Sequence, residues 1–204
     1  MPPQPVIAIA AQGFPSTAGL LVLSLTSALL LSLLAYYMRT GAPPVPARAG
    51  EAAQVVALLE RASLGPTPRV YDLGCGWGSL AVHLARALPG AEIIGLELSP
   101  LPWAVAKLRS LWHQNLTVRR ADFQRFDLRD ADAVTAYLMI RPMPPLARQL
   151  DRQLRPGTPV VTLTFWFRDR VPTAHRRGMG AWNGSAALYR WPGKHQNHFA
   201  RTRL

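Results

Sequence analysis

Short apolar segments alternate with helical segments from residue 69 onward, and this alternation constrains the fold more than any other feature of the sequence. Apolar runs typical of buried strands lie at 69–73, 92–98, 116–122, 133–139 and 158–167. Stretches with helical periodicity lie at 50–64, 79–90, 100–115 and 143–154. Strands that alternate with helices form parallel sheets. We therefore expect an α/β fold with a doubly wound, mostly parallel Rossmann-like sheet, followed by one more strand at 186–191.

The first 38 residues carry no charged side chain. Residues 18–38 are apolar enough to form a transmembrane helix, because 21 residues at helical rise cover roughly 31 Å of hydrocarbon. Arg39 and Arg48 follow this segment, so the positive-inside rule places the rest of the chain on the cytoplasmic side. A cleaved signal peptide is the alternative, although the basic region that begins such peptides is missing.

These features predict four parts: an N-terminal tail at 1–17, the transmembrane helix at 18–38, a Pro-rich tether at 39–49, and one catalytic domain at 50–204. The chain contains two Lys among its 23 basic residues, which is typical of GC-rich bacterial genomes. The expected location is therefore a bacterial inner membrane, with a single span and a cytoplasmic domain.

The formal charge of +12 is concentrated toward the C-terminus, where residues 133–204 contain 12 Arg or Lys and two Asp. Arg176, Arg177, Arg201 and Arg203 predict a basic surface that contacts anionic lipid, and nucleic acid is the less expected partner. A single cysteine excludes an intrachain disulfide framework. The five histidines lack metal-ligand spacing, so no metal is expected.

A glycine loop, Asp72-Leu73-Gly74-Cys75-Gly76-Trp77-Gly78, joins the first strand to its helix. Glycine removes the Cβ atoms that would keep a ligand from the backbone. The spacing is G-x-G-x-G, which differs from the G-x-G-x-x-G of dinucleotide-binding folds. In a doubly wound sheet this turn lies beside the ligand, so Asp72, Gly74, Cys75, Gly76 and Gly78 are candidate cofactor-binding residues.

Two further acids close the next two strands. Glu97, followed by Leu98, ends the second strand, where a carboxylate can accept hydrogen bonds from both ribose hydroxyls. Asp122 closes the third strand, and Phe123 follows it. A carboxylate there can accept an adenine amino hydrogen while the aromatic ring packs on the base. Leu98 and Phe123 complete the expected cofactor surface.

Read in order, these residues resemble the class I S-adenosylmethionine-dependent methyltransferases. Asp72 to Gly78 matches the first motif of that family, Glu97 matches its ribose-binding acid, and Asp122-Phe123 matches its adenine contact. The resemblance covers roughly residues 50–168. It implies S-adenosyl-L-methionine as the cofactor and methyl transfer as the reaction.

The order of segments resembles, more closely, the membrane-anchored protein lysine methyltransferases of mitochondria and their bacterial relatives. Those enzymes modify the adenine nucleotide translocase and the c-subunit of ATP synthase. The resemblance implies methylation of a lysine side chain in a membrane protein. The sequence departs from the pattern at 138–145, where Arg141 interrupts an apolar loop, and in its Arg-rich C-terminal part, and both departures affect the expected acceptor.

Tyr137, at the end of the fourth strand, is the candidate catalytic residue because it would orient or hydrogen-bond the acceptor amine. Capping of the sheet by this ring is an equally open interpretation. Phe165, Trp166 and Phe167 either wall an acceptor channel or pack in the core. Arg48 is a weak candidate for holding the methionine carboxylate of the cofactor.

Two other functions remain open. The same anchor and aromatic channel would serve methylation of a lipid or of a small molecule dissolved in the membrane. A basic membrane-docking module that only binds S-adenosylmethionine is the third possibility, but it leaves the catalytic arrangement unexplained. The acceptor, the number of methyl groups transferred and the oligomeric state do not follow from the sequence.

Overall fold

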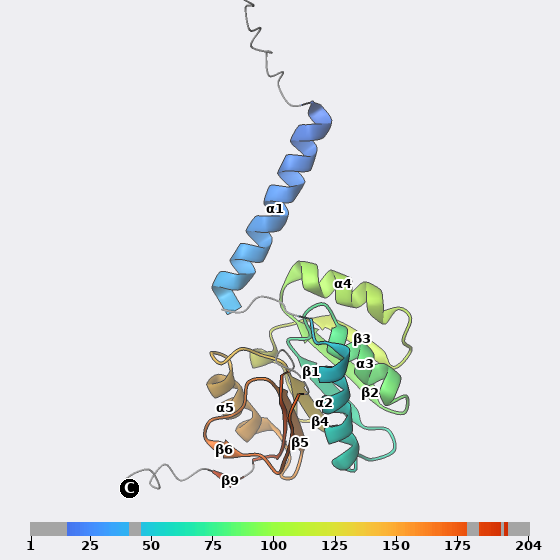
Figure 1. Ribbon diagram of the computed structural model, residues 1–204, viewed down its shortest axis with the longest axis vertical. Coiled ribbons are helices and arrows are strands. Elements are labelled where there is room, and N and C mark those ends of the chain that lie inside the picture. Colours follow the sequence, from blue (N-terminus) through green and yellow to red (C-terminus); the bar gives the residue numbers. More distant parts are fainter. Residues whose placement is uncertain (1–15, 41–45, 179–183, 193, 196–204) are drawn as a thin grey trace, which may run out of the picture.

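The computed structural model describes residues 16–40, 46–178, 184–192 and 194–195. A long helix, α1 (Thr17–Thr40), extends away from an α/β domain (Figure 1). Within these ranges, no helix combines the length and the apolar character needed to cross a membrane. The transmembrane helix predicted at 18–38 is therefore not supported, although the segment is helical. The predicted contacts of Arg201 and Arg203 lie outside the described residues.

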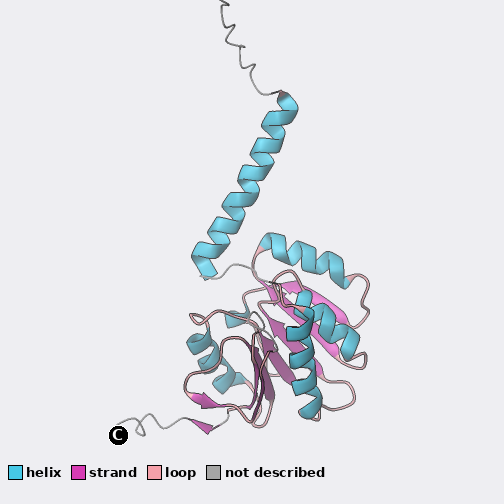
Figure 2. Cartoon of the chain, in the orientation of Figure 1, coloured by secondary structure: helices cyan, strands magenta, loops and turns pink. Residues whose placement is uncertain are grey.

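A mixed sheet forms the centre of the domain, and the helices cover both of its faces (Figure 2). Over the described residues, its strand order is β3-β2-β1-β4-β5-β8-β7. The first five of these strands are parallel. Their bounds are β1 (Arg69–Leu73), β2 (Glu92–Glu97), β3 (Leu116–Arg120), β4 (Ala133–Ala136) and β5 (Pro159–Leu163). The predicted Rossmann-like α/β fold is confirmed.

Two apolar clusters hold the helices against the sheet. Helices α2 (Ala49–Arg61), α3 (Ser79–Ala87) and α4 (Pro100–Ser110) share one cluster with the strands. Helix α5 (Met143–Gln153) and the short 3-10 helix η1 (Phe123–Arg125) lie on the opposite face with the second cluster. Alternate residues of each strand enter opposite clusters, as the pleat requires: Val70 joins the first and Tyr71 the second.

The C-terminal part differs from the expectation of one strand. Strand β8 (Ala186–Arg190) is the predicted one, and it pairs antiparallel with β5. Three short strands accompany it: β6 (Arg170–Val171), β7 (Ala174–Arg176) and β9 (Lys194–His195). Strands of two or three residues lack a readable apolar alternation, which is why the sequence does not reveal them.

The predicted fifth strand also ends earlier than expected, at Leu163 instead of residue 167. Thr164 adopts a left-handed φ of 67°, which turns the chain out of the sheet. Phe167 returns to the core, where its ring packs against Tyr189 and Trp191 at centroid distances of 5.3 and 5.1 Å. Of the two interpretations of Phe167, these contacts favour packing in the core.

A buried guanidinium joins this C-terminal part to α5, on the face of the sheet that carries the second apolar cluster. Arg170 donates to both carboxylate oxygens of Asp151 on α5 at 2.8 Å and to the carbonyl of Pro192. Its guanidinium carbon also lies 4.6 Å from the centre of the Trp191 ring. A bidentate pair with this packing fixes both partners in one orientation. The C-terminal strands are thus tied to α5.

Asn115 provides a testable contribution to the stability of this fold. Its side-chain nitrogen lies 3.0 to 3.1 Å from the carbonyls of Ala85, Leu88 and Ala91, which end α3 and lead into β2. Replacing Asn115 by alanine leaves these partly buried acceptors without their donor. We expect N115A to lower the free energy of unfolding by about 1 to 3 kcal/mol in urea denaturation. Q114A, at the exposed neighbour, should change it by less than about 0.5 kcal/mol.

Candidate active site

The expected cofactor residues meet at the edge of the sheet where the parallel strands end. Asp72 lies near the end of β1, Glu97 ends β2, and Asp122 follows β3. Neighbouring strands bring Asp72 opposite Gly95 on one side and Thr135 on the other. This edge faces upward in Figure 1, toward the side from which α1 extends. Parallel strands thus gather residues that are far apart in the sequence.

Asp72 is a buried carboxylate with one free oxygen. Its Oδ1 accepts a hydrogen bond from the Thr135 hydroxyl at 3.0 Å, while Oδ2 is buried and has no donor among the described residues. Burial raises the pKa of Asp72 to about 7; the Thr135 bond opposes the shift and the charge of Glu97 adds to it. An oxygen that lacks a donor in a buried site points to a ligand that supplies one.

Glu97 connects the end of β2 to the glycine loop. Its Oε2 accepts from the backbone N–H of Gly76 at 2.9 Å, and its Oε1 accepts from that of Ser99 at 2.8 Å. Burial raises the pKa of Glu97, and these backbone donors counteract the rise. Each carboxylate oxygen can accept a second hydrogen bond. The side chain therefore holds the loop and keeps acceptor capacity for a pair of hydroxyls.

The glycine loop has the backbone that its sequence predicts. Gly74 and Gly78 have φ values of 68° and 78°, in the left-handed region. A Cβ on Gly74 would lie 2.6 Å from a methyl carbon of Leu138, and one on Gly78 would lie 3.0 Å from the Cβ of Ala106 on α4. Glycine is needed at both positions because the backbone conformation and the close neighbours leave no room for a side chain.

Cys75 contributes backbone rather than side-chain chemistry to this loop. Its side chain is buried, and its sulfur would lie 2.9 Å from a Cβ built on Gly95 of β2. Burial raises the pKa of the thiol well above its usual value, and the charges of Asp72 and Glu97 add to the rise. A reactive thiolate at this position is therefore disfavoured.

Asp122 and Phe123 begin η1 beside the loop. Asp122 accepts from the backbone N–H of Gln124 at 3.0 Å, so one oxygen caps this short helix. The Phe123 ring lies 4.0 Å from the Cβ position of Gly74, which places it next to the loop. Leu98 is 41% exposed at the end of β2. These positions suit an aromatic base between an acid and apolar side chains.

Two supporting residues are not evident from the sequence. Thr135 is a buried hydroxyl in an otherwise apolar strand, and that isolated polar residue is the signal that could have identified it. Arg109 of α4 donates to the carbonyl of Trp77 at 2.9 Å and to the hydroxyl of Ser79 at 3.2 Å. The second of these bonds crosses 30 residues of sequence to hold the end of the glycine loop, and nothing in the sequence marks that contact.

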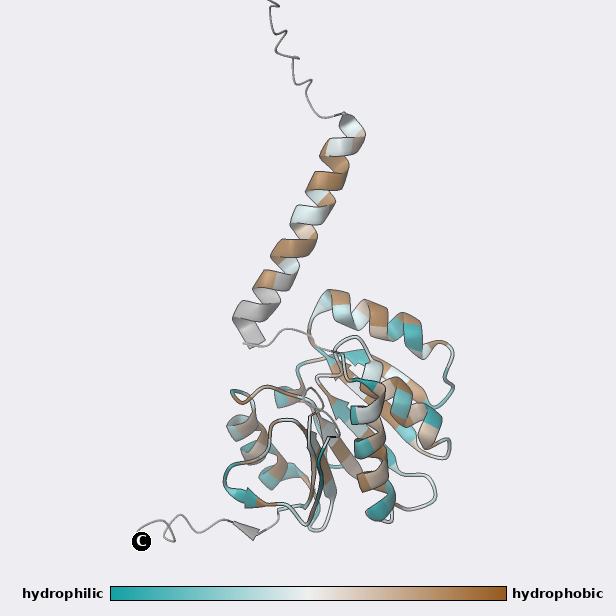
Figure 3. Cartoon of the chain, viewed as in Figure 1, coloured by the Kyte–Doolittle hydropathy of each residue, from teal (hydrophilic) through white to brown (hydrophobic). Residues whose placement is uncertain are grey.

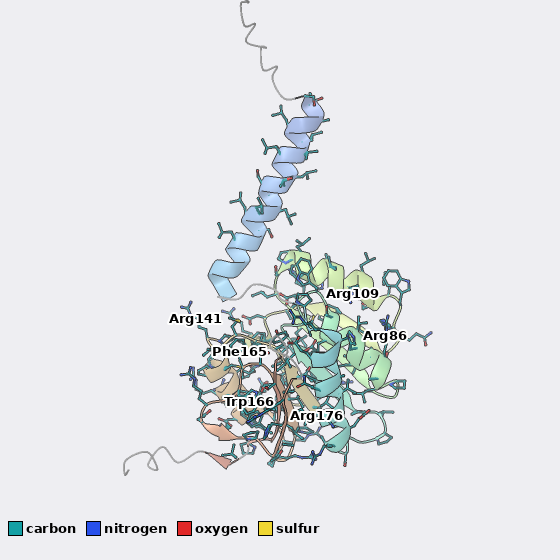
Figure 4. All side chains as sticks on the ribbon, viewed as in Figure 1. Arg86, Arg109, Arg141, Phe165, Trp166 and Arg176 are labelled. Carbon is teal, nitrogen blue, oxygen red and sulfur yellow. The ribbon has the colours of Figure 1, made fainter. Side chains whose placement is uncertain are left out.

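The expected acceptor side lies at the ends of β4 and β5. Tyr137 follows β4 directly and is partly buried against the α2–α4 side of the core. Trp166 is half-buried, with its indole N–H donating to the Ser185 carbonyl and its ring 5.8 Å from that of His175. Figure 4 labels Arg141 and Phe165 on the α5 side of the domain, and Arg109 on the side of α4.

Helix α2 reaches this acceptor side through Glu51, a residue that the sequence did not single out. Its carboxylate is buried and accepts from the backbone N–H groups of Arg48 and Gly184, both at 2.9 Å. The strained Thr164 lies against Gly184, and its N–H donates to Ser185. Left-handed strain at a non-glycine residue is often found beside functional sites. Arg48 caps the start of α2, and its role toward a methionine carboxylate stays a prediction.

The role of Glu97 can be tested by cofactor binding. E97Q replaces an acceptor oxygen by an NH₂ group that faces a backbone donor, so the loop loses a charge-assisted bond and the hydroxyl pair loses its acceptor. We expect S-adenosylmethionine to bind roughly 10- to 100-fold more weakly in titration calorimetry. The matched control is E92Q, at the exposed start of the same strand, where binding should be unchanged. Equal affinity in E97Q and wild type would contradict the assignment.

The raised pKa of Asp72 predicts a pH-dependent stability. Between the usual value of 3.8 and about 7, the folded protein keeps a proton that the unfolded chain releases. Stability therefore falls as the pH rises through this window, by on the order of 4 kcal/mol. D72N does not titrate, so its free energy of unfolding should rise relative to wild type between these two pH values. Urea denaturation across the window measures it, and a pH-independent difference would contradict the shift.

The sequence matches the family model described as the ANTKMT methyltransferase domain over residues 72–174. It is 29% identical over 119 residues to a protein-lysine N-methyltransferase of Saccharolobus islandicus, covering 56% of this chain and 73% of that protein. It is 32% identical over 117 residues to a ubiquinone biosynthesis O-methyltransferase of Hahella chejuensis, covering 55% of this chain and 48% of that protein.

A similar solved structure is the RNA methyltransferase from Salinibacter ruber in complex with S-adenosyl-L-homocysteine. The TM-score is 0.61 at 28% identity, and the match covers 71% of this chain and 92% of that one. The unpaired oxygen of Asp72, the open space beside Gly76 and the bridging carboxylate of Glu97 fit the same cofactor type. The chain therefore belongs to the ANTKMT methyltransferase domain family and is an S-adenosylmethionine-dependent methyltransferase.

Proposed function

We propose that this methyltransferase acts on a lysine side chain of a protein. The observation that carries the proposal is the similarity to the protein-lysine N-methyltransferase, which extends over 73% of that enzyme's length. The matched region of the family model, 72–174, also includes Tyr137 and the ends of β4 and β5, which line the acceptor side. The more specific prediction is that this lysine belongs to a membrane protein and lies on the cytoplasmic side of the membrane.

The residues of this chain act mainly by alignment. Bound S-adenosylmethionine supplies an electrophilic methyl carbon on a sulfonium, and transfer is an in-line displacement that needs no enzyme nucleophile. Glu97 and the glycine loop fix the nucleoside end of the cofactor at β2. The free oxygen of Asp72 is positioned to accept a hydrogen bond from the bound molecule. Tyr137 then lies on the side from which the acceptor nitrogen must approach.

A lysine acceptor must be neutral before it can attack. Removing its proton at neutral pH costs about 4 to 5 kcal/mol from a reference pKa near ~10.4. A partly buried surface lowers this cost, because desolvation disfavours the ammonium form. Tyr137, Phe165 and Trp166 are all partly buried at or after the ends of β4 and β5, and we assign this desolvating role to them. The Tyr137 hydroxyl can accept a hydrogen bond from the amine and direct its lone pair toward the methyl carbon.

RNA is the second candidate acceptor. The similar structure from Salinibacter ruber is an RNA methyltransferase, and the formal charge of +12 favours contact with phosphates. Against RNA, residues 137–140, which follow β4, read Tyr-Leu-Met-Ile and differ from the Asn-Pro-Pro-Tyr type of motif in enzymes that methylate nucleobase amines. The labelling experiment described next separates RNA from a protein lysine as the acceptor.

The decisive experiment incubates the purified protein and labelled S-adenosylmethionine with cell extract that has been separated into soluble protein, membrane, lipid and RNA fractions. We expect label in protein, with mass spectrometry placing it on lysine, and at least about tenfold less label with E97Q, in line with its weaker cofactor binding. E92Q serves as the matched control and should label like wild type. Label confined to RNA or to lipid would overturn the lysine proposal and support the corresponding alternative.

A second variant in the same assay tests Tyr137. Y137F keeps the ring and removes the hydroxyl, so cofactor affinity should stay unchanged while kcat falls by roughly 10- to 100-fold. An unchanged kcat in Y137F would show that the ring only caps the sheet, because the variant keeps the ring and lacks only the hydroxyl.

A further inference from the structure

Helix α4 exposes an apolar surface that the cofactor site does not use. Its buried face packs on the sheet through Ala106 and Ser110, and the opposite face carries Leu108, Leu111 and Trp112. These three side chains are 57%, 69% and 71% exposed. Leu108, Leu111 and Trp112, together with Ala104 one turn before Leu108 and Leu101 two turns before it, form what we call the α4 stripe.

The spacing shows that the α4 stripe is one continuous surface. Leu101, Ala104 and Leu108 recur at intervals of three and four residues, which places them on one side of a helix. Leu111 and Trp112 extend this side just past the end of α4. Exposed leucines that occur singly are ordinary, whereas a contiguous group that includes a tryptophan marks an interaction surface. Figure 3 shows apolar residues along both α4 and the described part of α1.

Positive charge surrounds the stripe, and negative charge is absent from the surrounding sequence. Residues 98–121 contain four basic side chains and no acidic one. Lys107 is exposed beside the stripe on α4. Arg120 ends β3, the strand beneath α4, and shares the face of Val118, which lies in the α4-side core. Arg120 is exposed as well, and within the described part of the chain no carboxylate forms a salt bridge with either cation.

We propose that the α4 stripe docks on an anionic lipid surface. Tryptophan and leucine side chains enter the headgroup region, where an amphipathic ring is favoured. Cations beside them attract anionic headgroups, each contributing about 1 kcal/mol near the surface. If the α4 stripes of two copies docked on each other, each stripe region would have to supply acidic groups for the cations of the other, and residues 98–121 contain none. Docking at this surface is independent of which acceptor the enzyme methylates.

The position of α4 in the sheet supports this occupant. Helix α4 covers β3, the edge strand, so its outer face is unobstructed by the other described helices. Figure 1 shows α4 on the side of the domain from which α1 extends. Ser99, the N-cap of α4, donates its N–H to Glu97. A surface that engages α4 is thus adjacent to the cofactor site.

The test uses the full chain with a polarity-sensitive NBD fluorophore attached at L111C. Cys75 is buried, and wild type treated in the same way measures its background labelling. The probe is a vesicle of phosphatidylcholine with phosphatidylglycerol. We expect the fluorescence to shift to the blue and to increase severalfold on mixing. The same label at R152C, on the exposed side of α5 across the sheet, should not respond.

Further variants separate docking at α4 from lipid contacts made by another part of the chain. Reversing both nearby charges, with K107E and R120E, should remove most of the response of the label at 111, and W112A should weaken vesicle binding. Binding to vesicles without a response at 111 would overturn the proposal, because another segment would then make the contact. An equal response to pure phosphatidylcholine would refute the role of anionic lipid. A response that grows with protein concentration in the absence of lipid would show that the occupant is a second copy.

Discussion

The site depends on the double connection that Glu97 makes between β2 and the glycine loop. One carboxylate accepts from Gly76 in the loop and from Ser99 at the start of α4, so a single side chain at the end of β2 fixes both the loop and α4. Without it, the loop would keep the bond from Cys75 N–H to the Leu96 carbonyl and the Arg109 contact, and would lose its link to the carboxylate at the end of β2. Burial disfavours the charged form of the Glu97 carboxylate, and the two backbone donors counteract this effect. Glu97 therefore fixes the position of the loop backbone relative to the end of β2.

The same pocket keeps two acids close together and mostly away from water. Asp72 and Glu97 lie on adjacent strands, where the charge of Glu97 disfavours ionisation of Asp72 and both charges disfavour that of Cys75. A positively charged ligand relieves this, since an opposite charge favours the ionised carboxylate. The sulfonium and amino groups of the cofactor carry such charge. On this argument the two acids would favour a positively charged methyl donor over a neutral nucleoside, and the free acceptor capacity of Glu97 would serve the sugar hydroxyls.

Sequence patterns predicted those helices and strands that are long enough to show a recognisable periodicity of apolar residues. The alternation of strands and helices, the glycine loop and the acids at strand ends all follow from residue spacing, and the structure brings Asp72, Glu97 and Phe123 to one edge. The short strands β6, β7 and β9 were not predictable, because two or three residues carry no periodicity. The membrane span inferred for 18–38 rested on composition alone and is not supported. Contacts between distant residues, such as Glu51 with Gly184, depend on tertiary packing that no local pattern encodes.

Arg109 links α4 to the cofactor loop, because its guanidinium donates hydrogen bonds to the carbonyl of Trp77 and to the hydroxyl of Ser79. Gly78, the N-cap of α3, adds a second connection. A Cβ at this position would lie 3.0 Å from the Cβ of Ala106 on α4, so α3 and α4 are packed too closely to slide past each other. Helix and loop therefore move as one body. The distance from the outer face of α4 to the cofactor loop is consequently set by these contacts, so an enzyme docked at α4, as proposed, would reach only acceptors at one height above the docking surface.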